Sequence, residues 1–204
     1  MQIQKFMEME SIDQAYTPKV TLRVVLPNKH AGALIGIKGN IAHNIEKKYS
    51  VKIHATPIIG RLVNITGSTQ NVASAWKMCL IHLSNGFPIQ YTKNAVLNFL
   101  LPVDLVALLK DQLEINLNFE YMARSTGITI KLKKGTLPRC TENVLQVVIP
   151  DLDHLGPFEQ LVYLLADVTR MHPHLSMSPE TKYYIPNATD EDFINSMEDD
   201  IVYN

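Results

Sequence analysis

Cysteine and long apolar runs are scarce in this chain of 204 residues, and both shortages exclude classes of protein. Cys79 and Cys140 are too few for a disulfide framework and lack the spacing of a metal site. We therefore expect a reduced, intracellular protein of the nucleus, the cytoplasm or both. No apolar run is long enough to cross a bilayer. Residues 1–13 lack the positive start and apolar core of a secretory signal.

Recognisable sets of catalytic side chains are also missing. The sequence shows no Ser/His/Asp or Cys/His arrangement, no carboxylate pair in a defined frame and no phosphate-binding P-loop. The run His172-Pro173-His174 is too short and isolated for a metal site. We therefore expect neither an enzyme nor a cofactor or metal site.

Acidic residues are rare in one part of the chain and concentrated in another. Residues 19–86 hold nine Lys or Arg and a single acid, Glu46, although the net charge of the whole chain is only −1. Residues 171–204 hold one lysine and seven acids. A concentration of positive charge is typical of a surface that binds a polyanion. We therefore place the expected binding function in residues 19–86.

Residues 19–86 have the periodicity of a compact α+β unit. Apolar alternation predicts strands and apolar spacing of three or four residues predicts helices. The order is strand, helix, helix, strand, strand, helix. The first five elements cover 20–26, 31–35, 41–49, 51–55 and 62–66, and the last helix carries Val72, Trp76, Cys79, Leu80 and Leu83.

A glycine turn, Gly36-Ile37-Lys38-Gly39, separates the two short helices. Glycine has no Cβ, so the backbone can bend sharply there and approach a ligand closely. Amide groups at the start of the following helix favour an anion, and Lys38 adds a mobile positive charge. This combination suits a sugar-phosphate backbone.

Element order and turn together resemble a type I KH domain, the nucleic-acid module of the poly(C)-binding and Nova proteins. The resemblance is carried by Ile35 to Gly39, by Ile45, by the strand Val51-Lys52-Ile53 and by the run from Arg61 to Gly67. It implies a three-stranded antiparallel sheet with helices on one face. It also implies a narrow groove that holds about four unpaired nucleotides.

The resemblance further implies which residues contact RNA. Phosphates would lie against the glycine turn near Lys38 and Asn40, and bases would lie on a floor of small and apolar residues that includes Ala55. Arg61 corresponds to an arginine at the edge of the groove, and Lys52 is a second candidate that strand alternation can direct outward. The expected RNA-binding residues are Gly32, Ala33, Gly36, Ile37, Lys38, Gly39, Asn40, Ala42, Lys52, Ile53 and Arg61.

Glu46 departs from the poly(C)-binding pattern. Those proteins have a basic residue directly after the position of Ile45, whereas this chain has an acid there, as the Nova type does. The departure argues against a strict preference for cytosine.

Residues 87–170 repeat the same order of elements without the glycine turn. Lys110-Asp111-Gln112-Leu113 stands at the corresponding place and Glu114 follows it. Acidic side chains there would repel phosphate at short range. We interpret this part as a degenerate KH-like unit that serves protein contacts or dimerisation. For Lys131, Lys133, Lys134 and Arg139 two alternatives remain, an auxiliary RNA contact and an ordinary solvated hairpin.

The two ends of the chain are expected to be less ordered. We predict a flexible N-terminus over residues 1–18 and a flexible acidic tail over residues 171–204. Alternatively, the tail wraps onto the folded part through apolar side chains such as Tyr184, or folds over the basic unit and competes with RNA. Residues 201–203 are expected to be a frayed end, with a short docking segment as the alternative.

Together these features predict a protein that binds single-stranded RNA through residues 19–86 in post-transcriptional control of mRNA, such as splicing, stability, localisation or translation. The alternative is a ribonucleoprotein scaffold in which protein contacts dominate and RNA binding is weak. Single-stranded DNA is a further candidate ligand, because a KH groove has little need for a 2′-hydroxyl group. A protein partner or a homodimer would use residues 87–170.

Overall fold

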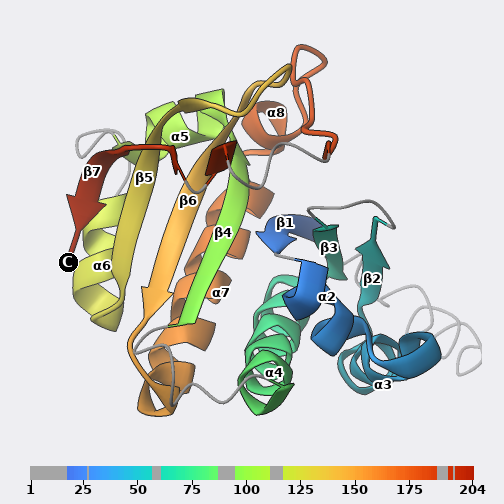
Figure 1. Cartoon of the computed structure of the whole chain (residues 1–204). Coiled ribbons are helices and arrows are strands. Elements are labelled where there is room, and N and C mark those ends of the chain that lie inside the picture. Colours follow the sequence, from blue (N-terminus) through green and yellow to red (C-terminus); the bar gives the residue numbers. More distant parts are fainter. Residues whose placement is uncertain are drawn as a thin grey trace, which may run out of the picture.

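A single antiparallel sheet organises the protein (Figure 1). The computed structural model describes residues 18–26, 28–56, 61–86, 95–110, 117–187, 193–194 and 196–204. Strands of this described part follow the order β2-β3-β1-β4-β6-β5-β7. Their bounds are β1 Val20–Leu26, β2 Lys52–Ala55, β3 Arg61–Gly67, β4 Ala95–Pro102, β5 Thr129–Thr136, β6 Glu142–Ile149 and β7 Asp199–Tyr203.

The helices complete two copies of one element order, which confirms the predicted α+β class. The first half reads β1-α2-α3-β2-β3-α4 and the second reads β4-α5-α6-β5-β6-α7. The helices are α2 Asn28–Ile35, α3 Asn40–Tyr49, α4 Thr69–Gly86, α5 Val103–Lys110, α6 Phe119–Thr126, α7 Leu155–Met171 and α8 Pro173–Ser176, with short 3-10 turns η1 Ile37–Gly39 and η3 Leu152–His154.

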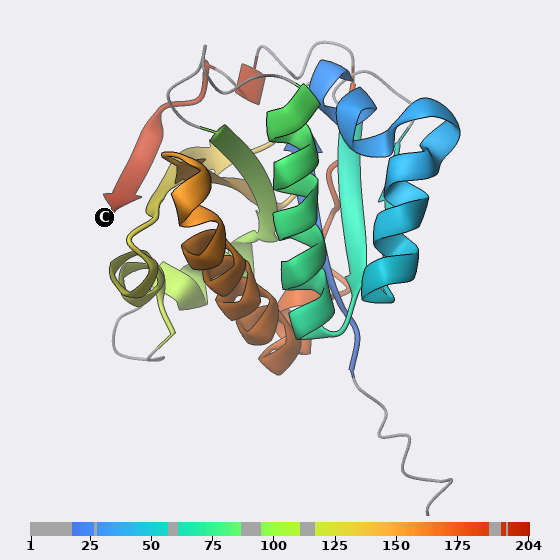
Figure 2. The same ribbon diagram turned by 90° about the horizontal axis from the view of Figure 1, so that it is seen from below.

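Each half contributes three antiparallel strands, as the resemblance implies, and the two sets join into one sheet. Strand β1 pairs with β4 through Arg23–Val25 and Asn98–Leu100. The long helices α4 and α7 lie side by side beneath this junction (Figure 2). The halves are therefore joined by main-chain hydrogen bonds and by helix packing. Residues 87–94, which connect α4 to β4, lie outside the described part.

One face of the sheet is covered by the helices and forms the main core. Alternate residues of the strands point to this face, as the apolar alternation in the sequence predicts. Trp76 of α4 is fully buried and its ring meets the ring of Phe99 edge-on, with centroids 5.7 Å apart. The core thus extends across the junction, since Trp76 belongs to the first half and Phe99 to the second.

The opposite face carries a second, smaller apolar cluster, which the chain after α8 helps to cover. Val25, Leu100 and Val144 of the sheet pack there with Tyr184 and Ile194, both nearly inaccessible to solvent. The expectation of a flexible tail is therefore wrong for this segment. Tyr184 and Ile194 are buried because they cover apolar residues of the sheet that would otherwise face solvent.

A buried ion pair fixes the tail to both halves. The Arg23 guanidinium pairs with the carboxylate of Glu142, whose side chain is fully buried, and also donates to the carbonyl oxygen of Tyr184 at 2.9 Å. The N–H of Tyr184 donates to Glu142 Oε2 at 2.6 Å. Burial raises the pKa of the Glu142 carboxyl, against the opposing effect of Arg23.

The last described segment, β7, is a strand and not a frayed end. It pairs antiparallel with β5, with Ile130 opposite Tyr203 and Leu132 opposite Ile201. Strand β5 extends through Lys133 to Thr136, and β6 pairs with it. Within the described part, no helix is long and apolar enough to cross a membrane.

Candidate nucleic-acid interface

The glycine turn forms a sharp bend between α2 and α3. Helix α2 ends at Ile35, and the N–H of Gly36 donates back to the carbonyl oxygen of Gly32 at 2.9 Å. Three residues of the turn have a positive φ: Gly36 at 75°, Lys38 at 53° and Gly39 at 80°. Helix α3 then starts at Asn40 without a side-chain cap. The start of α3 therefore faces the turn with amide groups that favour an anion.

Gly36 is required by its surroundings. A Cβ at this position would lie 2.3 Å from Asn40 Oδ1 and 2.6 Å from Ile41 Cγ1. Both distances are shorter than any real contact, so a side chain there must displace its neighbours. A Cβ at Gly39 would meet nothing within 4 Å, and only its positive φ restricts that position.

The expected floor of the groove is built from small and half-exposed residues. Gly32 is exposed, and Ala33 and Ala42 are partly buried. Ile53 of β2 is also partly buried and packs against the main core. A Cβ at Gly32 would meet open space, so the protein's own packing does not explain the absence of a side chain there.

Two side chains of the turn project into solvent. Ile37 is 82% exposed, the highest value among the large hydrophobic residues that the structure describes. Lys38 is exposed and is absent from the ion pairs among the described residues. Asn40 is exposed beside them, with its Oδ1 close to Gly36. An apolar group and a cation are thus presented together at the turn.

Lys52 and Arg61 are the two charged strand residues predicted to contact RNA. The structure describes the side chain of Lys52 but not that of Arg61. Lys52 is exposed opposite Thr66 of β3. Because Ile53 faces the helices, strand alternation places Lys52 on the other face of the sheet, away from the groove. Lys52 thus takes the outward direction that strand alternation allows for it. Arg61 begins β3, and its side chain lies outside the described part.

Glu46 has a structural partner that the sequence did not indicate. Its Oε1 accepts a hydrogen bond from the N–H of Ile53 at 2.8 Å, and its Oε2 lies 3.7 Å from His43 Nδ1. The carboxylate therefore ties the open edge of β2 to α3. The acid of the first half is occupied in this way, and the charge that faces a ligand at the turn remains positive.

In the second half, two of the predicted cations already have acidic partners. Lys131 and Lys133 both pair with Asp199 of β7, at 3.2 Å and 2.6 Å. The last strand of the tail, β7, thus lies at the edge of the second half, which is the opposite edge of the sheet from β2. The residues at 111–114 that replace the glycine turn lie outside the described part.

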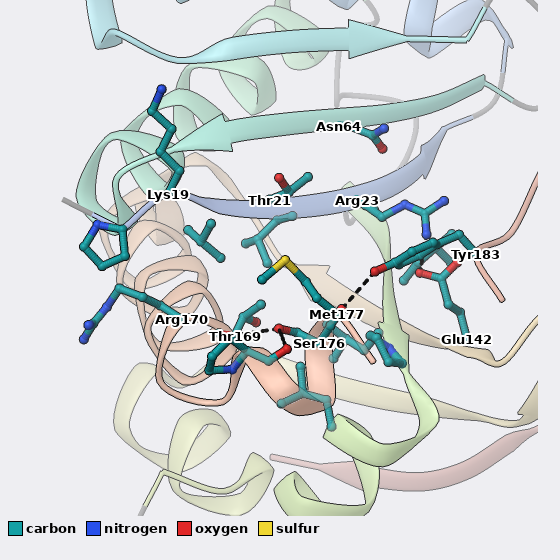
Figure 3. A pocket seen from close by; sticks show the side chains of 18 residues that line it. Lys19, Thr21, Arg23, Asn64, Glu142, Thr169, Arg170, Ser176, Met177 and Tyr183 are labelled. Carbon is teal, nitrogen blue, oxygen red and sulfur yellow. Dashed lines mark hydrogen bonds and ion pairs between the residues drawn. The ribbon is translucent and has the colours of Figure 1, made fainter. Parts of the chain in front are cut away.

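A cavity that the sequence did not predict opens at the junction of the halves (Figure 3). Its volume is about 610 Å³, and it lies where β1 and β4 diverge, beside α8. Arg23, Met177 and Tyr183 line it, and the hydroxyl of Tyr183 donates to the carbonyl oxygen of Ser176 at 3.2 Å. No residue of the glycine turn belongs to it. Its lining comes from segments far apart in the sequence, so no local pattern signals it.

Comparison with known proteins agrees with the geometry of the first half. A family model described as the KH domain matches residues 21–80. A comparison with curated proteins finds no similar sequence. A chain of the a/eIF2alpha–aDim2p–rRNA complex from Pyrococcus horikoshii is 16% identical, with a TM-score of 0.30, over 81% of this chain and 99% of that one. Dim2p from the same organism is 15% identical, with a TM-score of 0.29, over 71% and 98%.

KH domains clamp about four nucleotides of single-stranded nucleic acid with a Gly-x-x-Gly loop. The matched region contains the turn at 36–39 and the strand and helices around it. It therefore supports RNA binding in general. Residues 21–80 of this chain form a KH domain.

Proposed function

We propose that residues 19–86 bind single-stranded RNA in the groove beside the glycine turn, and that this binding serves post-transcriptional control of mRNA. One observation carries the proposal: Ile37 and Lys38 project side by side from a turn whose adjacent wall is made of residues with little or no side chain. Phosphate fits the cation and the amides, and a base fits the open wall.

A groove of this size neutralises few phosphates, so its affinity is expected to be micromolar or weaker. Useful affinity then requires avidity or a partner. We propose that the second half, a degenerate KH-like unit, supplies protein contacts. Support comes from its shared sheet with the first half and from the strand that covers its edge.

The double variant Ile37→Asp/Lys38→Asp tests the RNA site. Both side chains are exposed, so we expect the melting temperature to remain unchanged while affinity for labelled single-stranded RNA is lost in fluorescence anisotropy. Leu152→Asp/Lys182→Asp is a matched control, because it makes the same change of charge at exposed residues outside the first half. Full RNA affinity in the first variant would disprove the proposal.

A second candidate function is that of a ribonucleoprotein scaffold. It is favoured by the large share of the chain that lies in the second half, outside the KH domain. Sedimentation of the purified protein with and without candidate partners tests it. A complex or dimer that depends on residues 95–170 is expected, and a strict monomer with no recovered partner would contradict it. Parallel titration with DNA of the same sequence separates RNA from DNA binding.

A further inference from the structure

Strand β7 occupies a position in the second half that corresponds to the RNA groove of the first. In the first half the groove lies between α3 and the open edge of β2. By element order, α6 and β5 are the counterparts of α3 and β2. Strand β7 pairs with the edge of β5 and contacts α6 (Figure 1). The chain's own C-terminal segment therefore fills the place that is left open in the first half.

The contacts of β7 are strongly complementary in charge. Asp199 Oδ1 lies 2.6 Å from Lys133 Nζ, and Oδ2 lies 3.2 Å from Lys131 Nζ. Asp200 Oδ2 lies 3.1 Å from Lys110 Nζ. Three ammonium groups of the second half thus meet two consecutive acidic residues. Lys133 is nearly buried and also donates to the carbonyl oxygen of Met197 at 3.1 Å, so this cation is fixed in place.

Apolar contacts add a second element of recognition. Tyr203 packs against the ring of Phe119 on α6, with ring centroids 5.5 Å apart. Ile201 lies opposite the buried Leu132, and the register shifts by one residue next to it, at Asp200. The site therefore accepts an extended segment with two acidic residues, an aliphatic residue directly after them and an aromatic residue two positions further.

The strand is held weakly enough to be exchanged. It has five residues, and its ion pairs with Lys110 and Lys131 are partly exposed. Pairs of this kind contribute about 0–1 kcal/mol each. The edge of β5 can thus become free while the rest of the sheet stays intact.

We propose that the edge of β5 is a docking site for an extended acidic segment of a partner protein, and that β7 fills it in cis until such a partner displaces it. The mode is strand addition, in which main-chain hydrogen bonds give affinity and the lysines and Phe119 give specificity. This inference rests on the proposed role of the second half in protein contacts and does not depend on RNA binding.

A synthetic peptide with the sequence of residues 197–204 is the probe. The full-length variant Asp199→Lys/Asp200→Lys is expected to release β7, because it places new cations opposite Lys131 and Lys133. Labelled peptide should then bind this variant saturably in fluorescence anisotropy. Wild type should bind at least about tenfold more weakly, because a tethered competitor has an effective concentration near the millimolar range.

The control is Asp153→Lys/Glu180→Lys, which makes the same change of charge at exposed residues away from β5. It should bind the peptide as weakly as wild type, and equal binding to both variants would overturn the proposal. If the first variant does not fold by circular dichroism, Tyr203→Ala weakens β7 without changing any charge. A folded β7-release variant that does not bind the peptide would also overturn it.

Charge exchange tests the mode of recognition. The variant Lys131→Glu/Lys133→Glu should no longer bind the original peptide. It should bind instead a peptide in which both aspartates are replaced by lysine. Labelled single-stranded RNA is added to the β7-release variant that also carries Ile37→Asp/Lys38→Asp. RNA binding there would show that the uncovered site is a nucleic-acid groove and would overturn the proposal. If the wild-type protein does not bind RNA, by contrast, only the proposed function is contradicted.

Discussion

Substituting alanine for each glycine of the turn should separate steric requirement from backbone conformation. Gly36 has φ 75° and ψ 178°, a region that is essentially restricted to glycine, where another residue costs about 1–3 kcal/mol. Its Cβ would also overlap Asn40 Oδ1 and the side chain of Ile41. Asn40 is exposed and can move away, whereas Ile41 packs against the main core.

The expected loss of stability is the sum of the cost of the backbone conformation and the cost of the overlap with Ile41. Forcing extra atoms against a packed core side chain costs about 1–3 kcal/mol. Gly36→Ala should therefore lower the free energy of unfolding by about 3 kcal/mol, within the sum of the two ranges. Gly39→Ala meets no atom within 4 Å and has a left-handed conformation, which costs about 1 kcal/mol.

Urea unfolding monitored by circular dichroism measures both changes. The midpoint should fall in both variants at an unchanged slope. By thermal unfolding, the melting temperature should fall by about 6–12 °C for Gly36→Ala and about 2–4 °C for Gly39→Ala. Equal losses in the two variants, or a stable Gly36→Ala protein, would refute the geometry of the turn.

Three further predictions follow. Gly32→Ala should stabilise the protein by up to about 1 kcal/mol, because alanine favours the helix and its Cβ meets open space. The same substitution should weaken RNA binding, because the added methyl group fills the floor of the proposed groove. An unchanged RNA affinity would contradict the groove. Glu142→Ala should cost about 3 kcal/mol by leaving Arg23 and the Tyr184 N–H without their acceptor, and Arg23→Met/Glu142→Leu should recover much of that loss in urea unfolding. Hydrogen bonds from Lys133 and Lys131 lower the pKa of the Asp199 carboxyl. The stabilisation of β7 by ionised Asp199 is therefore present above the ordinary pKa of 3.8 and is lost as the pH falls through the lowered pKa. Amide hydrogen exchange of β7 should show this loss, and Asp199→Asn should remove the pH dependence.

The predicted groove was partly readable from the sequence. Its glycine turn and the small residues of α2 and α3 follow one another along the chain, so a local pattern is enough to name them. The direction of Lys52 stayed open in the sequence, because strand alternation settles it only once Ile53 is known to pack against the helices. The contact of Glu46 with the edge of β2 was missed because a backbone N–H leaves no signal in a sequence.

Local patterns in the sequence are enough to define the order of the elements and the position of the turn. Both follow from properties of neighbouring residues: the period of apolar side chains and the missing Cβ of Gly36 and Gly39. Tertiary structure alone decided that β1 pairs with β4 and that Arg23 meets Glu142, 119 residues further along the chain. It also decided that the acidic tail covers the edge of β5, since composition records the charge of Asp199 but not which lysines it will meet.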